Sequence, residues 1–355
     1  MVASAPAEHI IEPSLPIIDA HHHLYILPEA SLMAMEHEDS LISRALIPVL
    51  RRHPRYVFDE FMADVGSGHN VRATVHIDAE TMYRASGPEW MRSVGEVEFI
   101  NGIAAISASG LFGDVKICAA IVGGGIDLRM GERVEDALTT HIQVAGGRYR
   151  GIRGLAVAYD EDSRMLWGGV GVPHLLLDTA FRRGFKILGQ LGLSFDVWLF
   201  EPQLPELIDL ARAFPETRII LDHVGTPLGV GRYAGKREER FPIWCESMRT
   251  LARCPCVTVK LGGLGIPLGG FDSDLSTPPA TSLQLAEEWR PYIETCIGAF
   301  GADRCMFESN FPVQSGTCTY PVLWNAFKRL TAGASEHEKT ALFGGTAIRE
   351  YRLDV

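Results

Sequence analysis

The chain has too few cysteines for disulfide bonds to stabilise its fold. The 355 residues include seven cysteines, an odd number, and several stand in apolar stretches such as "VKICAAIV" around Cys118. Disulfide scaffolds are short and dense in cysteine, so this composition favours reduced thiols and a cytoplasmic protein. The "CPC" at 254–256 has no second thiol pair at a fitting distance, and we expect it to be structural rather than a metal site.

Positive charge and long apolar runs are lacking as well. The formal net charge is −11, whereas binding of nucleic acid needs clustered Lys and Arg. No apolar run free of charge and frequent glycine reaches the roughly 18 residues that a membrane span requires. The start, "MVASAPAEHIIEPSLP", has neither the basic nor the apolar region of a signal peptide. We therefore expect no nucleic-acid or membrane partner, and a surface arm over 1–15 ahead of one domain over 16–355.

A recurring strand pattern is what the chain does contain. Eight short runs rich in β-formers are mainly apolar instead of alternating, which is typical of strands buried on both faces of a parallel sheet. These predicted strands are 16–23, 71–79, 115–123, 149–158, 193–200, 218–225, 256–263 and 304–311.

Helical patterns separate these strands and close the chain. Eight such units predict an α/β fold, a (β/α)8 TIM barrel. The segments after the strands are long at 24–70, 159–172, 226–241 and 264–282, whereas those that enter the strands are short. Because the loops after the strands form the C-terminal face of such a barrel, we predict that the active site lies there. The predicted helices are 88–110, 133–145, 173–192, 202–214, 242–254, 283–301, 320–330 and 335–353.

Three consecutive histidines end the first predicted strand, in "PIIDAHHHLY". Side chains alternate along a strand, so Asp19, His21 and His23 are predicted to face the barrel mouth and His22 to pack outward. Two imidazoles at i and i+2 on a strand can hold one divalent metal through a ring nitrogen each. This pattern predicts a metal or catalytic site.

Other polar residues end later strands. His223 in "ILDHVG" closes the sixth strand, where the alternation turns Asp222 the other way. Asn310 in "FESNFP" closes the eighth, and Glu308 shares its parity. We predict His223 and Asn310 to be site residues at the mouth.

Cations and aromatic residues suggest how a substrate could be held. Lys260 in "VTVKLGG" needs a partner inside an apolar strand; its candidates are a substrate carboxylate, Glu308 or Asp196. His76 and Arg153 are either substrate contacts or parts of a buried ion pair or core hydrogen bond. Three aromatic residues could form an entrance suited to a ring-bearing substrate, or could be core; they are Tyr25, Trp167 and Trp198.

The order "DAHHHLY", "ILDHVG", "VKLGGLG" and "RCMFESNFPV" resembles the amidohydrolase superfamily, in its amidohydrolase-related branch, over about 16–353. That branch includes lactonases and metal-dependent, non-oxidative decarboxylases. The resemblance implies a divalent metal, zinc first, on His21, His23 and His223.

Two positions depart from the family pattern. The aspartate that ends strand eight is Asn310 here, and the strand-five histidine is missing, with Asp196 and Trp198 at that parity. An amide cannot act as a base, although its oxygen can coordinate weakly or orient a water. Three histidines without a carboxylate can still coordinate zinc. A metal-free site is the alternative.

Three functions follow from this resemblance. The first is a hydrolase that opens a small carboxylated or aromatic lactone. Its catalytic residues would be His21, His23, His223 and Asn310, and its substrate contacts Tyr25, His76, Arg153, Trp198 and Lys260. The second is a metal-dependent decarboxylase of an aromatic or unsaturated acid, and the third a decayed barrel that only binds a small molecule. The arm and the 24–70 segment could also pack on a second copy of the chain.

Overall fold

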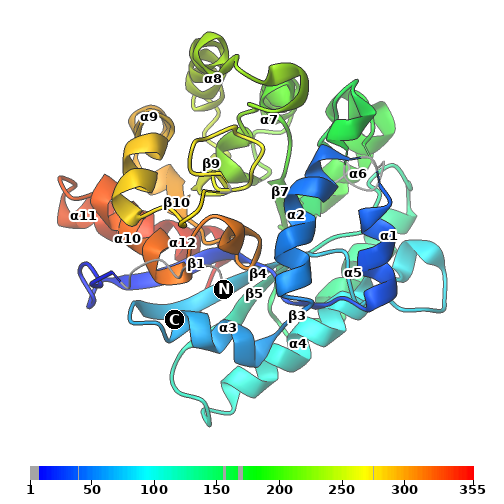
Figure 1. Ribbon diagram of the computed structural model, residues 1–355. Coiled ribbons are helices and arrows are strands. Elements are labelled where there is room, and N and C mark those ends of the chain that lie inside the picture. The colour runs from blue at the N-terminus through cyan, green and yellow to red at the C-terminus, as the bar shows by residue number, and fades with distance from the viewer. Residues whose placement is uncertain (1–7, 39, 155–156, 167–170, 275) are drawn as a thin grey trace.

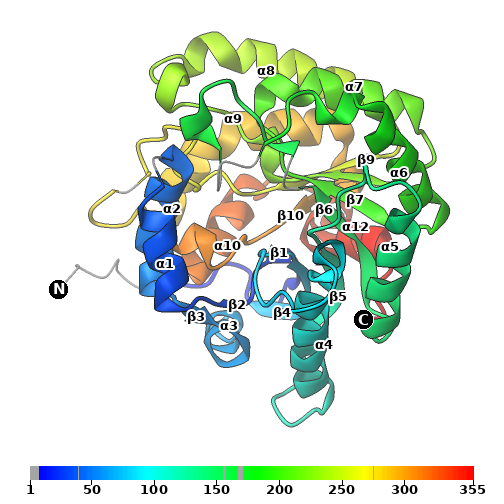
Figure 2. The ribbon, with the colours of Figure 1, turned by 90° about the vertical axis from the view of Figure 1, so that its right-hand side faces the viewer.

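The barrel is built from eight parallel strands in one sheet. The computed structural model describes residues 8–38, 40–154, 157–166, 171–274 and 276–355. Strand order follows the chain, and Figure 2 shows the helices surrounding the strands. The (β/α)8 prediction is confirmed, and each predicted strand overlaps one observed strand, with the second one beginning one residue before its predicted range. These are β1 (Pro16–His22), β4 (Asn70–Ile77), β5 (Lys116–Gly123), β6 (Tyr149–Gly154), β7 (Ser194–Val197), β8 (Ile219–Leu221), β9 (Val257–Leu261) and β10 (Cys305–Phe307).

The ring closes just beyond the ends of β1 and β10. The His23 N–H donates to the Phe311 carbonyl at 2.8 Å, and the Asn310 N–H donates to the His21 carbonyl at 2.8 Å. These bonds join the histidine triplet directly to the chain that follows β10. Asn310 is therefore brought next to His21 and His23 by the closure of the barrel itself.

The helices occupy the predicted intervals, with two differences. The 24–70 segment is not an irregular loop, since it contains three helices and two short strands, β2 (Tyr25–Ile26) and β3 (Arg55–Tyr56), which pair antiparallel. The loop expected over 226–241 ends early because α8 begins at Arg237. The helices are α1 (Glu29–Glu36), α2 (Leu41–Arg52), α3 (Phe58–Val65), α4 (Val94–Ala108), α5 (Arg133–Val144), α6 (Thr179–Gln190), α7 (Leu204–Ala213), α8 (Arg237–Leu251), α9 (Ser282–Phe300), α10 (Tyr320–Leu330), α11 (Glu336–Thr340) and α12 (Thr346–Tyr351).

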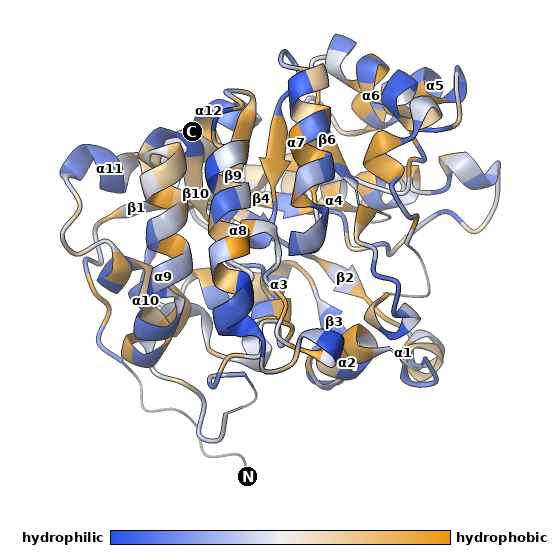
Figure 3. Cartoon of the chain, turned by 90° about the horizontal axis from the view of Figure 1, so that it is seen from above, coloured by the Kyte–Doolittle hydropathy of each residue, from blue (hydrophilic) through white to orange (hydrophobic). Residues whose placement is uncertain are grey.

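Two apolar layers hold the barrel. The larger layer lies between strands and helices, where the tryptophans Trp244, Trp289 and Trp324 are buried. A smaller cluster joins residues from β4 and β5 to residues from β8 and β10, across the ring, so it fills the barrel interior. Figure 3 shows apolar colour on the central strands and mixed colours along the surrounding helices. None of the helices in the described ranges is long and apolar enough to cross a membrane.

The helices α1 and α2 lie side by side at one edge of the molecule (Figure 1). The Ser40 hydroxyl caps α2 by accepting from the Ser43 N–H at 3.2 Å and donates to the Leu166 carbonyl at 2.7 Å. Arg51 on α2 pairs with Glu36 on α1 at 2.7 Å. These contacts hold the pair of helices in a defined place after β1.

Gly184 in α6 is required by close packing. A Cβ at this position would lie 2.0 Å from the Leu128 carbonyl oxygen, whereas a Cβ at Gly298 in α9 would meet nothing within 4 Å. Gly184→Ala should lower the free energy of unfolding by about 1–3 kcal/mol, since overpacking outweighs the helix propensity of alanine. Gly298→Ala should raise it by about 0.5–1 kcal/mol. Urea denaturation checks both variants, and equal effects would contradict the packing.

Candidate active site at the mouth of the barrel

The inner side chains near the mouth form a buried charge cluster. Lys260 on β9 has its Nζ 2.9 Å from Asp196 Oδ2 and 3.0 Å from Asp222 Oδ1. Tyr351 donates a further hydrogen bond to Asp196. All four side chains are inaccessible to solvent. Of the two outcomes left open for Lys260, the structure shows a buried ion pair, with Asp196 as predicted and Asp222 in addition.

Burial and pairing act in opposite directions on this cluster. Burial alone would lower the pKa of Lys260, but Asp196 and Asp222 raise it. Burial disfavours the charge on Asp222, yet Lys260, His223 and Arg153 lower its pKa. Lys260 and Asp222 are therefore shifted toward their charged forms by their neighbours, whereas burial raises the pKa of Asp196 in spite of Lys260.

Glu308 links two histidines. Its Oε1 lies 2.6 Å from His223 Nδ1, and its Oε2 lies 2.8 Å from His21 Nδ1. Burial disfavours the charge on Glu308, but His223 and His21 hold its pKa well below the usual range. The carboxylate is thus ionised, and it fixes the orientation of both rings.

The ring nitrogens can be assigned from their partners. His23 Nδ1 lies 2.8 Å from the Ile77 carbonyl, which only accepts, so Nδ1 carries the proton. His21 Nδ1 is also 3.2 Å from Lys260 Nζ, but the ammonium lies closer to its two carboxylates. The shorter contact of His21 to Glu308 therefore assigns a proton to its Nδ1 as well. In neutral rings this leaves Nε2 with a lone pair on both histidines.

These lone pairs converge on one point. His21 Nε2 lies 3.1 Å from His23 Nε2, which lies 3.2 Å from Asn310 Oδ1. Burial is the largest cause that lowers the pKa of His21 and His23, and it lowers both well below the ordinary value, so both rings are neutral. Three acceptor atoms so close together repel one another unless a cation lies between them. The donor set therefore fits a divalent metal.

A third histidine borders this point. The ring centroids of His21 and His223 are 4.8 Å apart. Atoms of His21, His223 and Glu308 also lie within 4.8 Å of one another, a group that could hold an ion. This region contains three ionisable carboxylates and two cationic side chains, Lys260 and Arg153. The carboxylates are those of Asp196, Asp222 and Glu308. That excess of negative charge also favours a bound cation.

A cavity of about 110 Å³ opens above these residues. His23, His223, Asn310 and Arg153 line it, and Glu308 leaves Nε2 as the available nitrogen of His223. Arg153 donates to the Asp78 carbonyl at 3.1 Å and lies over the Trp198 ring at 5.7 Å. The predicted residues Tyr25 and Trp198 line the same cavity; Trp167 lies outside the described residues.

His76 does not line the cavity, and of the two outcomes left open for it the structure shows the buried ion pair or hydrogen bond instead of the substrate contact. Its neighbours Val75 and Ile77 belong to the interior cluster, so His76 points outward. There its Nε2 is 3.1 Å from Glu96 Oε1 on α4. Lys260, similarly, lies beneath the cavity and is not among the residues that line it.

Alternation misplaced two acidic side chains, Asp19 and Asp222. The β1–β4 register shifts between Asp19 and His22, so Asp19 faces outward, where the Tyr320 hydroxyl donates to it at 3.0 Å. Asp222 faces inward, and His223 reaches the mouth only because the chain turns left-handed there, with φ of 54°. His22 packs outward as predicted, stacked on Phe61 at 4.1 Å between centroids.

Sequence reasoning left Glu308 and Asp222 out of the predicted site. The signal for Glu308 was its parity with Asn310, and for Asp222 its parity with the interior residue Ile220. Both carboxylates directly follow buried strands, where an unpaired charge is costly. That position could have identified them.

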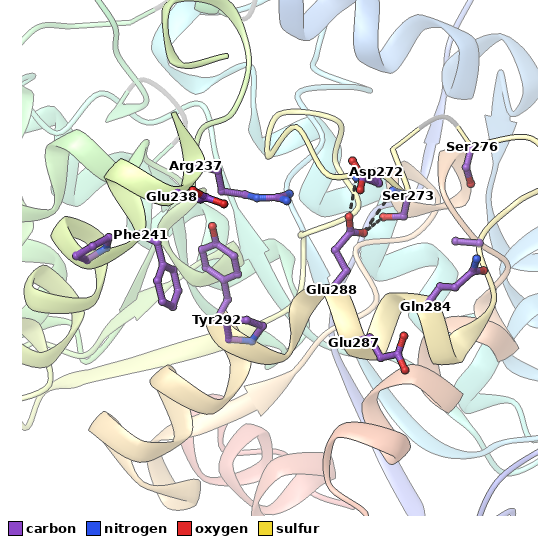
Figure 4. Close-up of a pocket in the computed structure, with 13 residues that line it drawn as sticks. Arg237, Glu238, Phe241, Asp272, Ser273, Ser276, Gln284, Glu287, Glu288 and Tyr292 are labelled. Carbon is purple, nitrogen blue, oxygen red and sulfur yellow. Dashed lines mark hydrogen bonds between the residues drawn. The ribbon is translucent and has the colours of Figure 1, made fainter. Parts of the chain in front are cut away.

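A second, larger hollow lies elsewhere on the surface. It has a volume of about 740 Å³ between α8, α9 and the 272–280 segment, and no histidine lines it. Figure 4 shows Glu288 of α9 in this hollow, where it accepts from the Asp272 N–H at 2.6 Å and from Ser273. The Glu288 carboxylate is thus engaged by neighbouring chain, and the smaller cavity, which His23 and His223 line, is the better candidate for an active site.

Comparison with known proteins finds one matching family model and two similar curated proteins. The family model described as Amidohydrolase matches residues 18–353. The uncharacterized protein y4mH of Sinorhizobium fredii is 32% identical over 338 residues, which cover 95% of this chain and 98% of that protein. An L-fucono-1,5-lactonase of Burkholderia multivorans is 30% identical over 177 residues, 50% of this chain and 57% of that protein.

A solved structure shares the fold over nearly the whole length. It is an amidohydrolase of Burkholderia multivorans with bound zinc, and it superposes with a TM-score of 0.70 at 24% identity. The likeness covers 95% of this chain and 99% of that one. It supports the barrel assignment independently of the strand pattern.

Lys260 offers a test of the charge cluster. Lys260→Met should lower the free energy of unfolding by about 3–5 kcal/mol at pH 8, because two buried carboxylates lose their cation. Burial would then raise the folded pKa of Asp196 and Asp222 above the unfolded value of about 3.9. The loss should therefore shrink as pH falls toward 5, where these groups take up protons. Urea denaturation at the two pH values measures this, with exposed Lys186→Met as control. A pH-independent loss would contradict the pairing.

Proposed function

The chain belongs to the amidohydrolase family, and from this premise we propose that it hydrolyses a small cyclic ester. The observation that carries the proposal is the contact of His223 Nδ1 with Glu308 Oε1 at 2.6 Å. A histidine oriented by a carboxylate, with its other nitrogen toward a cavity, is the arrangement of a general base. The lactonase similarity, which spans half of this chain, points to the same reaction class.

The reaction follows from the positions of these groups. A water between His223 and the substrate attacks the carbonyl carbon, and its proton passes to His223 Nε2. Glu308 stabilises the imidazolium that forms. When the tetrahedral intermediate collapses, the ring C–O bond breaks and the leaving oxygen takes the proton from His223. The product is an open hydroxy acid.

Two further residues contact the substrate in this proposal. Asn310 Nδ2 is buried without a partner among the described residues and borders the cavity, so it can donate to the oxyanion. Arg153 supplies positive charge to the same cavity. Asn310 thereby orients the substrate and stabilises the oxyanion. His223 acts as the base in place of the strand-eight aspartate of the family pattern.

His21 and His23, through Nε2, and the Asn310 amide oxygen would hold a divalent cation, with zinc as the first candidate and His223 at its side. Such a cation would supply Lewis acidity for the carbonyl and lower the pKa of water. His23 Nε2 lies 3.1 Å from His21 Nε2 and 3.2 Å from Asn310 Oδ1. This close grouping of donor atoms is the observation that supports the fit. His21 and His23 are thus the ligands that the resemblance implied, whereas the Asn310 oxygen takes the place that the resemblance gave to His223, which acts here as the base.

Metal content tests this ligand set. His21→Ala and His23→Ala should each remove most of the stoichiometric zinc that survives dialysis, measured by elemental analysis. His22→Gln is the matched control, since His22 packs outward and glutamine can still bond to Thr74, whose hydroxyl is 2.9 Å from His22 Nε2. Zinc retained equally in all three variants would refute the assignment.

The base assignment has its own test. His223→Gln and Glu308→Gln should each lower kcat for lactone opening by roughly 10²- to 10⁴-fold, the usual contribution of a positioned base. His22→Gln again serves as the control and should keep kcat. Acid release in a pH-stat assay measures turnover of a lactone panel. Release of carbon dioxide from hydroxybenzoates without any lactone opening would instead establish the decarboxylase.

A further inference from the structure

The cavity above the histidines has two unlike walls. Its floor carries the polar groups at the strand ends, His23, His223, Asn310 and Arg153. Its roof is apolar and comes from α1, α2 and the loops after β9 and β10. The roof residues are Met35, Ile42, Leu46, Leu50, Ile266 and Val313.

The roof is built mainly by one face of α2. Ile42, Leu46 and Leu50 are spaced four residues apart, so they lie in a row along the helix. All three line the cavity, and the Ser40 cap and the Arg51–Glu36 pair fix the helix at its two ends. A ligand on the floor therefore meets a preformed hydrocarbon surface above it.

The lower walls offer hydrogen-bond donors that nothing in the described chain satisfies. The Tyr25 hydroxyl, Trp198 Nε1 and Asn310 Nδ2 are buried without a partner, and each residue lines this cavity. A buried donor left unpaired costs about 1–3 kcal/mol. Three of them around one cavity indicate a ligand that presents several acceptor oxygens at one end.

We infer that the substrate is a single-ring lactone that carries a hydrocarbon substituent and is not a polyhydroxylated sugar lactone. The lactone oxygens face the donors and Arg153, and the substituent lies against Leu46 and its neighbours on α2. Hydroxyl groups turned toward the roof would lose their water without gaining a partner. The volume of about 110 Å³ is far below the ~300–1,000 Å³ of clefts for larger ligands, which restricts the ring to one. This inference rests on the proposed function and specifies its substrate class.

Turnover of two lactones tests the class. We expect kcat/KM for γ-hexalactone to exceed that for galactono-1,4-lactone by at least tenfold, as about 1.4 kcal/mol of apolar contact provides. Leu46→Ser should lower kcat/KM for γ-hexalactone by about tenfold and leave galactono-1,4-lactone unchanged. Met33→Ser is the matched control, since Met33 is 49% exposed on α1, and should change neither value. Preference for the sugar lactone, or an equal loss for both lactones in Leu46→Ser, would overturn the inference.

Binding separates failure of the inference from failure of the function. If no lactone of the panel is opened, the hydrolase proposal is wrong. Calorimetric titration with γ-hexalactone then still measures whether the apolar roof residues contribute to binding affinity. Affinity that exceeds that for galactono-1,4-lactone and falls in Leu46→Ser supports the amphiphilic cavity. Equal or absent binding of both lactones overturns it.

The donors have a separate readout. Trp198→Phe keeps an aromatic ring beside Arg153 but removes the N–H. It should raise KM for γ-hexalactone by about five- to twentyfold, the effect of one lost hydrogen bond in a buried site. An unchanged KM would mean that this donor does not meet the substrate and would overturn its part in the inference.

Discussion

The contact of one carboxylate, Glu308, with two imidazoles is the interaction on which the mouth of this barrel depends. Glu308 Oε1 accepts from His223 Nδ1 at 2.6 Å, and its Oε2 lies 2.8 Å from His21 Nδ1. Because Glu308 engages Nδ1 of each ring, Nε2 of His223 faces the cavity and Nε2 of His21 faces His23. Neither histidine could serve as a ligand or base with its ring in another orientation.

Glu308 can remain ionised only because the charges around it are balanced. Lys260 lies beneath it, between Asp196 and Asp222, and all of these side chains are buried. The cluster links β7, β8, β9 and β10 from inside, so it also fixes these strands relative to one another. Asn310 is neutral in this setting, and the negative charge of the site is carried one level deeper, by Glu308.

The sequence predicted the barrel well because buried parallel strands leave a plain apolar signal. It also placed His21, His23, His223 and Asn310 at one mouth, since all stand at strand ends. Prediction failed where the backbone departs from regular alternation. Asp19 faces outward beside the register shift in β1, and Asp222 faces inward, while the left-handed turn after Leu221 still brings His223 to the mouth.

Other features were beyond reach for a different physical reason. The roof formed by α1 and α2 depends on how the 24–70 segment folds back over the mouth, which is a matter of tertiary packing. His76 was ambiguous because either face of β4 is buried. Only the interior cluster, with Val75 and Ile77 as members, decides that it points outward to Glu96.

The central claim is that Glu308 orients two imidazoles, so that the unprotonated Nε2 of His223 faces the cavity and that of His21 faces His23 Nε2. Nitrogen chemical shifts of the imidazoles in ¹⁵N-histidine-labelled protein test it most directly, with single His→Gln variants for assignment. The account predicts Nδ1–H and an unprotonated Nε2 for both rings, and loss of that signature in Glu308→Gln. Rings that carry the proton on Nε2, or that are unaffected by Glu308→Gln, would contradict it.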